Sequence, residues 1–351
     1  MAYRSSRSDL PPRKVGGGGR GVKASPKVLK IAQLIKDMRV RGAGRIARAA
    51  AYAMKIAALE YKGSSLDDYL TYMRHNAQIL TSTRPTAVSL HNAVRYVMNK
   101  VRRASSCEEG VEMAVKAADS FIVSSLNAVR NIGEIGSRLI EDGDVVLTHC
   151  NSSAALSVIK TAYRKGKNIV AYATETRPKF QGLLSYRELV DAGVPTTLIP
   201  DSAVRYFIRD VDKVVVGADT VTANGAVVNK IGTSLIALAA YEAGVKLYVA
   251  TETYKFSPAT ILGELVEIEE RGADEVLPTH ILSKYTNLKV RNPAFDVTPP
   301  EYIDAIITER GIIPPKAAAL ILLEDYGAEV AEELTKVTID LEEGLPLYST
   351  D

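Results

Sequence analysis

The chain has 351 residues, of which 46% are hydrophobic, so it can bury the core of one large domain or of two domains. Its net charge of +3 is too small to require a nucleic-acid partner, although basic residues are concentrated in residues 1–27. Two cysteines, Cys107 and Cys150, without paired spacing argue against a disulfide scaffold or a cysteine zinc site, and the lack of a long apolar run or a secretion signal favours a cytoplasmic protein without a membrane span.

Residues 1–25 combine serine, arginine and proline with four consecutive glycines from Gly16 to Gly19. This composition buries too little apolar surface to offset the entropy of ordering, and it predicts a flexible basic tail. The glycine run is not expected to be a phosphate loop, because no strand precedes it and no lysine-serine pair follows it.

Residues 26–120 are predicted to form an α-helical N-terminal domain, because apolar residues recur at steps of three and four. The predicted helices start at Pro26 and then cover Ile46–Leu59, Asp67–Leu80 and Ser89–Arg102. Before the second helix, the segment Arg41–Gly44 is compatible with an anion site at a helix start or with a glycine turn flanked by solvated arginines. Arg84 lies in a loop where Pro85 ends the helix, and a surface arginine is its simplest interpretation.

Residues 121–351 are predicted to form a Rossmann-like catalytic domain. Glu108–Glu141 forms one or two helices, with Gly133 and Gly136 as candidate breaks, and strands then alternate with helices. This alternation predicts an α/β fold with a mainly parallel sheet covered by helices. The predicted strands are Val145–Leu147, Ile169–Ala173, Thr196–Ile199, Val214–Val216 and Leu247–Ala250, and the intervening helices cover Ser153–Arg164, Gln181–Asp191, Ala203–Ile208 and Thr233–Tyr241. From Leu277 onward we expect a structured loop, Asn292–Pro299, and then two helices.

Each predicted strand is followed by polar, reactive or charged side chains, which in a parallel sheet lie on one edge. After the first strand, Cys150 precedes a helix start at Ser153 that could bind phosphate through its N–H groups. Cys150 is either a thiolate base or nucleophile with a lowered pKa, or a small buried side chain at a strand end. His149 points the other way along the strand and is expected to pack, while Lys255 is either a solvated loop lysine or an anion clamp.

The segment from Gly217 to Thr233 places an acid, an amide and a cation after the fourth predicted strand. Asp219 would stand at the sheet edge, and Asn229 and Lys230 follow an Asn224-Gly225 turn. The simpler alternative is an N-cap or turn aspartate followed by a surface hairpin.

Together these motifs resemble a known enzyme superfamily, over a match that runs from about residue 27 to the C-terminus. The superfamily comprises methylthioribose-1-phosphate isomerase, ribose-1,5-bisphosphate isomerase and the regulatory subunits of translation initiation factor 2B. The residues that carry the resemblance are Arg41–Gly44, Arg84–Val88, Thr148–Ser153, Glu175–Pro178, Gly217–Asp219, Asn224–Gly225, Asn229–Thr233 and Asn292–Pro299. Within the superfamily, Arg41–Gly44, Cys150–Ser153 and Glu252–Phe256 look most like the archaeal-type ribose-1,5-bisphosphate isomerase, since the methylthioribose enzymes usually carry proline at Gly44.

The resemblance implies conversion of α-D-ribose 1,5-bisphosphate to D-ribulose 1,5-bisphosphate without a cofactor or metal. It makes Cys150 the proton-abstracting residue and Asp219 the proton donor. The implied substrate contacts are Arg41, Gly42, Ala43, Gly44, Arg84, Ser152, Ser153, Ala154, Asn229, Lys230 and Lys255. Relatives also imply a homo-oligomer, a hexamer built from dimers, whereas activation by AMP or another nucleotide is left open.

These roles suit the chemistry. A C1 phosphate locks the sugar ring, so an acid must protonate the ring oxygen while a base removes the C2 proton. Asp219 can be that acid only when protonated, which an apolar setting near Val216 and Val221 would favour. Two alternatives stay open: a non-catalytic regulatory subunit of initiation factor 2B type, and a methylthioribose-1-phosphate isomerase, which needs an apolar pocket in place of a second phosphate clamp.

Overall fold

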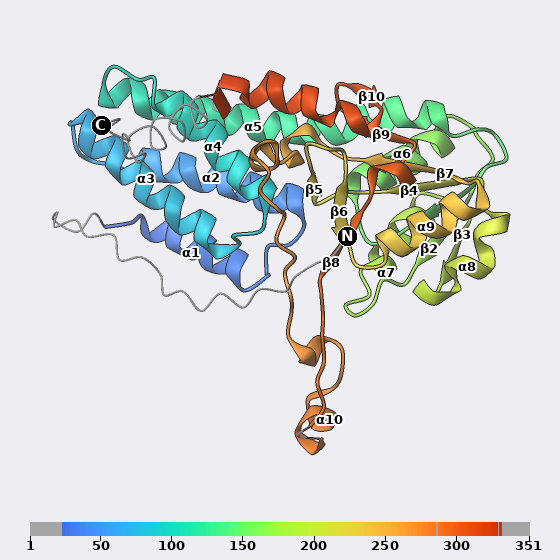
Figure 1. The fold of residues 1–351 in the computed structure, drawn as a ribbon. Helices are drawn as coiled ribbons and strands as arrows, with labels where there is room; N and C mark the ends of the chain where they lie inside the picture. The colour runs from blue at the N-terminus through green and yellow to red at the C-terminus, as the bar shows by residue number, and fades with distance from the viewer. Residues whose placement is uncertain (1–22, 286, 329, 332–351) are drawn as a thin grey trace, which may run out of the picture.

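The computed structural model describes residues 23–285, 287–328 and 330–331 of the chain. Within these residues, a bundle of helices lies at one end, a seven-stranded sheet at the other, and helix α5 runs along both (Figure 1). The predicted α/β fold with a helical first part and a Rossmann-like second part is confirmed. None of the helices in these ranges combines the length and the apolar character needed to cross a lipid bilayer.

The helical part is built around α2, whose buried residues are mostly alanines that allow neighbouring helices to approach closely. Its helices are α1 (Pro26–Lys36), α2 (Ala43–Glu60), α3 (Leu66–Thr83) and α4 (Val88–Val101). Ser25 caps α1 by accepting a hydrogen bond from the N–H of Val28, and its hydroxyl donates to Glu60 Oε2 at 2.5 Å. Ser25 is buried, so it belongs to the helical part and not to the predicted tail, of which residues 1–22 lie outside the described residues.

Helix α5 (Cys107–Gly136) joins the two parts, since it packs against α2 and α4 and also against α6 (Ser153–Arg164). The prediction of a possible break at Gly133 is wrong, because α5 continues through Gly133 to Gly136; Gly133 instead lets α5 approach α6 closely. A Cβ atom on Gly133 would lie 2.2 Å from Ser157 Oγ. Residue 120, where we place the domain boundary, lies inside this shared helix, so the division stays a proposal.

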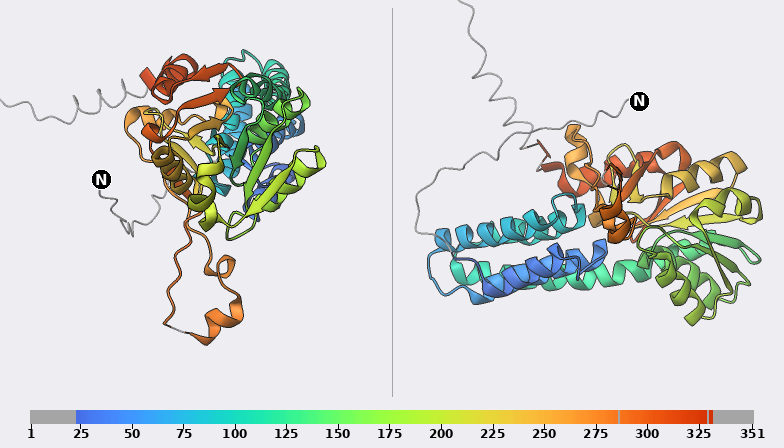
Figure 2. Two further views of the ribbon diagram at one scale, coloured as in Figure 1. Left: turned by 90° about the vertical axis from the view of Figure 1, so that its right-hand side faces the viewer. Right: turned by 90° about the horizontal axis from the view of Figure 1, so that it is seen from below.

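The large sheet has helices on both faces (Figure 2). Its strands are β1 (Val145–Thr148), β2 (Val170–Thr174), β3 (Thr196–Ile199), β4 (Lys213–Val216), β7 (Lys246–Ala250), β9 (Ala305–Thr308) and β10 (Gly311–Ile313). They lie in the order β10-β9-β7-β4-β1-β2-β3, parallel except for β10. Val214 and Val216 belong to the core on the side of α8 (Val204–Phe207) and α9 (Thr233–Ala243), whereas Val215 belongs to the core under α5, α6 and α7 (Gly182–Asp191).

A second, antiparallel sheet sits beside the first and consists of β5 (Thr220–Val221), β6 (Val227–Lys230) and β8 (Phe295–Thr298). The Asn224-Gly225 turn joins β5 to β6, with Gly225 at φ 84°. The hairpin therefore exists, but its strands are buried, so the surface-hairpin interpretation is wrong.

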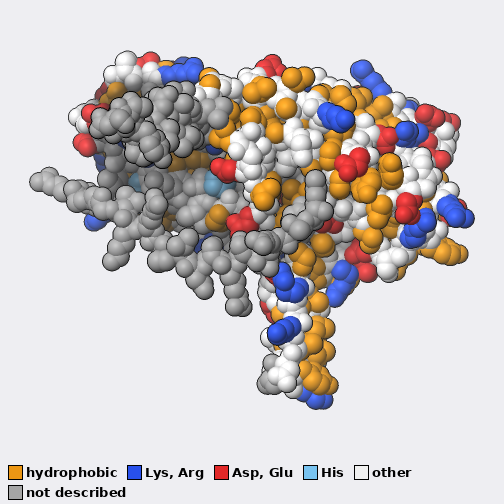
Figure 3. Space-filling model, viewed as in Figure 1, with side chains coloured by type: hydrophobic (Ala, Val, Ile, Leu, Met, Phe, Trp, Pro, Cys, Tyr) orange, Lys and Arg blue, Asp and Glu red, His pale blue; other side chains and the backbone are white. Residues whose placement is uncertain are grey.

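Between β7 and β8 the chain leaves the body as an arm, residues 270–292, which carries α10 (Thr279–Lys284) (Figures 1 and 2). Apolar side chains line part of this arm in Figure 3, and Tyr285 and Leu288 are 55% and 44% exposed.

The prediction of two helices after Pro299 missed the strands that come first. The structure has β9 and β10 there, and helical residues 318–328 follow. A short apolar run such as Ala305–Thr308 fits a buried strand or a buried helix segment equally well, and only its pairing with β7 decides between them. One helix follows the strands, and a second one would fall on residues from 332 onward, which lie outside the described residues.

Candidate active site

The order of the strands creates a switch point between β1 and β4. The chain continues from β1 to β2 and β3 on one side, and from β4 to β7 and β9 on the other. In open parallel sheets, ligands bind beyond the carboxyl ends of the strands at such a point. Cys150 follows β1 and Asp219 follows β4, so the two predicted catalytic residues flank the switch point.

Cys150 is held in an unusual backbone conformation between β1 and α6. Its φ of 66° lies in the left-handed region, which costs a non-glycine residue roughly 1–3 kcal/mol. The backbone N–H of Cys150 donates to Thr176 Oγ1 at 2.9 Å, and its carbonyl accepts from Ser185 Oγ at 2.6 Å. Two neighbouring segments therefore fix the backbone of Cys150.

Four charged or titratable side chains interact at this point. The thiol of Cys150 lies within electrostatic reach of Lys230, Asp219 and Arg271. Burial raises the pKa of Cys150 to about 11, because it outweighs the positive charges of Lys230 and Arg271. The expectation of a lowered pKa is therefore wrong, because desolvation disfavours the thiolate more than Lys230, the N–H of Asn151 and Arg271 favour it.

Asp219 is tied to the same edge of the sheet. Its N–H donates to the carbonyl of Val228 at 2.9 Å, directly before Asn229 and Lys230. Gly217 touches the N-cap of α6, since a Cβ atom on Gly217 would lie 2.3 Å from Ser152 Oγ. The prediction that Asp219, Asn229 and Lys230 line one cleft with Cys150 and Ser152 stays a prediction; the structure brings Asp219 and Lys230 within electrostatic reach of Cys150.

The segment after Cys150 starts α6. Ser152 is its N-cap and accepts from the N–H of Ala155, Ser153 is its first residue and exposed, and Ala154 is buried. The hydroxyl of Ser153 and the free N–H groups of this turn are therefore the parts of the segment that a phosphate can reach.

Lys230 is buried and held over an aromatic ring. Its Nζ donates to the carbonyl of Ala294 at 2.8 Å and lies 4.5 Å from the centroid of the Phe295 ring. Burial lowers the pKa of Lys230, which nearby Cys150 and Asp219 partly oppose. Its neighbour Asn229 donates from Nδ2 to Thr233 Oγ1 at 2.9 Å.

Lys255 is a paired cation. Its Nζ lies 2.6 Å from Glu252 Oε2, and both side chains are buried. Burial alone would raise the pKa of Glu252, but Lys255 and hydrogen bonds lower it, so the pair is ionised. Lys255 therefore offers less net charge to a ligand than its sequence position suggests.

The segment Arg41–Gly44 approaches the Glu252–Lys255 pair. Gly42 is the N-cap of α2 at φ 87°, and Ala43 is its first residue. A Cβ atom on Gly44 would lie 3.0 Å from the hydroxyl of Tyr254. Arg41 itself is exposed, directly before this helix start.

Arg84 is not a free surface arginine. It ends α3, and its Nη2 lies 2.6 Å from Glu269 Oε2 in an ion pair where the two side chains are 13% and 21% exposed. Glu269 also accepts from Nε of Arg271 at 3.1 Å. Sequence analysis missed Glu269 and Arg271, because the run from Glu267 to Arg271 shows neither a strand nor a helix period.

His149 packs, as predicted. Its Nε2 donates to the carbonyl of Ile231 at 2.9 Å, and its Nδ1 accepts from Thr174 Oγ1 at 2.6 Å. Burial lowers the pKa of His149, which keeps the ring neutral. Asp201 is also structural, since it accepts from the backbone N–H groups of Thr176 and Arg177 at 2.8 and 2.7 Å.

Asp296 is a further residue that the sequence did not reveal. It caps α9 from β8 by accepting from the N–H groups of Gly232 and Ser234 at 2.7 and 3.1 Å. Burial raises the pKa of Asp296 to about 6. Asp296 lies in the segment Asn292–Pro299, which carries part of the family resemblance, but that resemblance assigns no role to the carboxylate.

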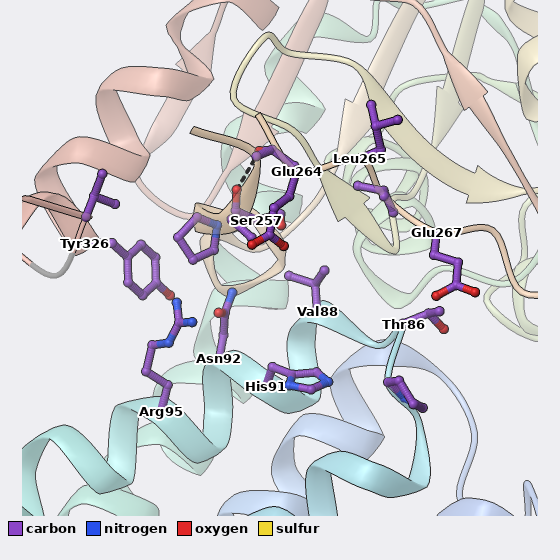
Figure 4. A pocket seen from close by; sticks show the side chains of 16 residues that line it. Thr86, Val88, His91, Asn92, Arg95, Ser257, Glu264, Leu265, Glu267 and Tyr326 are labelled. Atoms are coloured by element: carbon purple, nitrogen blue, oxygen red, sulfur yellow. Dashed lines mark hydrogen bonds between the residues drawn. The ribbon is translucent and has the colours of Figure 1, made fainter. Parts of the chain in front are cut away.

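A cavity of about 400 Å³ lies away from Cys150, at the junction of the two parts (Figure 4). His91 and Asn92 of α4 line one wall, and Ser257 and Glu264 line the opposite one. Asn92 donates from Nδ2 to the carbonyls of Tyr254 and Phe256 at 3.0 and 2.8 Å. Among the described residues, no group of three or more histidine, cysteine or acidic side chains is placed to hold a metal ion.

Residues 39–315 match the sequence profile of the initiation factor 2 subunit family. The chain belongs to this family. Among curated proteins, the ribose 1,5-bisphosphate isomerase of Thermococcus kodakarensis is 53% identical to this chain over 306 residues. The match covers 86% of this chain and 95% of that protein.

Solved structures show the same fold. This family member matches the translation initiation factor eIF-2B of Pyrococcus horikoshii with a TM-score of 0.72 at 34% identity, covering 83% of this chain and 98% of the other. It matches the 5-methylthioribose 1-phosphate isomerase of the same organism with a TM-score of 0.70 at 32% identity, covering 85% and 87%.

Proposed function

We propose that this family member is an aldose-ketose isomerase that converts α-D-ribose 1,5-bisphosphate to D-ribulose 1,5-bisphosphate. The observation that carries the proposal is the placement of Cys150 and Asp219 at the ends of adjacent parallel strands. Lys230 interacts electrostatically with both of them. The identity of 53% to a ribose 1,5-bisphosphate isomerase supports the same reaction.

In the proposed mechanism, protonated Asp219 donates its proton to the ring oxygen as the bond between C1 and that oxygen breaks. Cys150, as thiolate, takes the proton from C2, and the electrons of that C–H bond form an enol phosphate between C1 and C2. Cys150 then returns the proton to C1 while Asp219 takes back the proton of the C2 hydroxyl. The C2 oxygen becomes a carbonyl, and no electron donor or acceptor is required.

The two phosphates are proposed to bind at the cations and helix starts around this pair. Lys230 lies beside Cys150, and Arg84 is held near it through Glu269 and Arg271. The first turns of α2 and α6, at Arg41–Gly44 and Ser152–Ala154, offer backbone N–H groups to phosphate oxygens.

We also propose a cytoplasmic homo-oligomer, with dimers assembled into a hexamer. Exposed apolar side chains support an association surface, among them Leu235 and Tyr241 of α9, which are 63% and 61% exposed. Activation by AMP or another nucleotide belongs to the same proposal and is tested by adding the nucleotide to the assay.

The decisive experiment compares turnover of ribose 1,5-bisphosphate and methylthioribose 1-phosphate by purified protein without added metal or nicotinamide. We expect turnover of the bisphosphate, and Cys150→Ser and Asp219→Asn should each lower kcat by about 10²- to 10⁴-fold, as loss of a general acid or base does. Cys107→Ser is the matched control, because Cys107 is buried in the helical part and bonds to the carbonyl of Gly63.

Each other outcome has a defined meaning. Preferential turnover of methylthioribose 1-phosphate would replace the proposal by that isomerase activity. Absence of turnover with stoichiometric binding to initiation factor 2 would replace it by a regulatory role. Full activity in both variants would refute the assignment of Cys150 and Asp219.

A further inference from the structure

The base of the arm, where residues 269–272 run beside residues 292–294, lies at the candidate active site. The outgoing and returning segments of the arm lie side by side at its base, where the N–H of Arg271 donates to the carbonyl of Asn292 at 2.9 Å. The N–H of Ala294 donates to the carbonyl of Glu269 at 2.8 Å, and Nδ2 of Asn292 donates to the carbonyl of Gly272 at 3.0 Å. These bonds fix the backbone on both sides of Arg271.

The side chain of Arg271 is largely buried and directed toward the site. It is 11% exposed, and its Cζ lies 5.8 Å from the centroid of the Phe295 ring, over which Lys230 also lies. Nε of Arg271 donates to Glu269, so the amino groups at Nη1 and Nη2 are the donors that can reach a ligand.

Positive charge exceeds negative charge in this cluster. Arg84, Arg271 and Lys230 surround one carboxylate, Glu269, and burial of that carboxylate would raise its pKa, but Arg84 and Arg271 lower it. Asp219 and Asp296 are further acids within reach of Lys230. Asp219 is the proposed proton donor, and Asp296 also caps α9, so three cations face two ionised carboxylates, Glu269 and Asp296. Buried cations without equal countercharge are stable when an anion binds, and the guanidinium fork matches the oxygens of a phosphate.

We propose that Arg271 is a substrate-binding residue that, together with Lys230, binds the C1 phosphate. The inference rests on the proposed function. Cys150 removes the proton from C2, and the C1 phosphate is attached to the adjacent carbon, so the cations within electrostatic reach of Cys150 are those that meet this phosphate. The C5 phosphate is three carbons further along the sugar and belongs to other cations of the site.

The test measures binding of ribose 1-phosphate and ribose 5-phosphate by titration calorimetry, independently of turnover. Arg271→Ala should weaken binding of ribose 1-phosphate by about 10- to 100-fold, because it removes charge-assisted hydrogen bonds. The Kd of Arg271→Ala for ribose 5-phosphate should stay within about twofold of the wild-type Kd, a change too small for the loss of a direct contact. Arg271→Lys, which keeps the charge but not the fork, should weaken ribose 1-phosphate binding by an intermediate factor.

Arg291→Ala is the matched control on the same arm. Arg291 pairs with Glu270, and its side chain is 77% exposed, so binding of both sugar phosphates should be unchanged. The inference is overturned if Arg271→Ala leaves ribose 1-phosphate binding intact, or if it weakens both ligands equally. If Arg271→Ala does not fold, the same criteria apply to Arg271→Lys.

The result is distinguishable from failure of the proposed function. If wild type binds ribose 1-phosphate through Arg271 but does not turn over the bisphosphate, the isomerase proposal fails and the phosphate site stands. If wild type is active while Arg271→Ala and Arg291→Ala bind both ligands like wild type, only the role of Arg271 falls.

Discussion

The thiol of Cys150 is protonated at neutral pH, because burial raises its pKa from 9.0 to about 11. The ultraviolet absorbance of the thiolate, taken as wild type minus Cys150→Ser, should therefore stay near zero up to about pH 9 and grow above it. A thiolate signal from Cys150 already at about pH 8 would contradict the raised pKa of its thiol. The difference between wild type and Cys107→Ser gives the signal of the other cysteine, and so checks that the first difference belongs to Cys150.

The same shift links Cys150 to stability. The folded pKa lies above the unfolded value, so the stabilising contribution is complete below about pH 9 and is lost as the pH rises through about 11. In the proposed reaction, the fraction of thiolate is small at neutral pH, and Lys230 and Arg271 are the groups that increase it.

Sequence reasoning located Cys150 and Asp219 because both follow apolar strand patterns. It gave the wrong sign for the pKa of Cys150, because a helix start is visible in sequence but the depth of burial depends on how distant segments pack. Glu269 and Arg271 were missed for a related reason. Their position depends on the base of the arm, whose pairing joins segments about 20 residues apart without a strand pattern.

At the scale of elements, the contact between the β4–β5 loop and α6 depends on Gly217. Gly217→Ala should displace Ser152, because the added Cβ would lie 2.3 Å from its Oγ and 2.5 Å from its Cβ. We expect a loss of about 1–3 kcal/mol in the free energy of unfolding, together with a raised KM for the sugar phosphate. Urea denaturation and steady-state kinetics check the two effects.

Gly327→Ala is the control for that experiment. Gly327 lies in the helical residues 318–328, and a Cβ atom there meets open space. This variant should be unchanged or more stable by about 0.5–1 kcal/mol, since alanine favours a helix. Equal behaviour of the two variants would show that Ser152 is not held by close packing against Gly217.

Elements with a clear period were predictable, as α6 and the strands β1 to β4 and β7 show. The stretch after Pro299 was not, because Ile306 and Ile307 are apolar without revealing a period. Gly133 was misjudged as a candidate break, since its actual role is a close approach to Ser157 that only the folded structure reveals.

At the scale of the whole molecule, Asn92 connects the helical part to the segment Glu252–Phe256, which follows β7. Asn92→Ala would leave the buried carbonyls of Tyr254 and Phe256 without their donor, which should cost about 1–3 kcal/mol of stability. Because Lys255 lies between these two residues, we also expect a higher KM. Urea denaturation and initial rates measure both.

The comparison variant for Asn92→Ala is Gln33→Ala. Gln33 makes an exposed hydrogen bond to Asp37 within α1, and its removal should change stability by less than about 0.5 kcal/mol. If Asn92→Ala were as mild as Gln33→Ala, the two parts would be held together by other contacts.

The ion pair of Arg84 with Glu269 has a consequence for how the protein acquires activity during folding. It joins residues 185 positions apart, and the bond from Asn92 to Phe256 spans 164. Contacts of such long range form only after a large entropic cost of loop closure, and a high contact order slows folding. Helices can therefore form early in the nascent chain, but the cations proposed to bind phosphate converge only when the chain beyond Arg271 is available, so partly folded or truncated chains should be inert toward the proposed substrate.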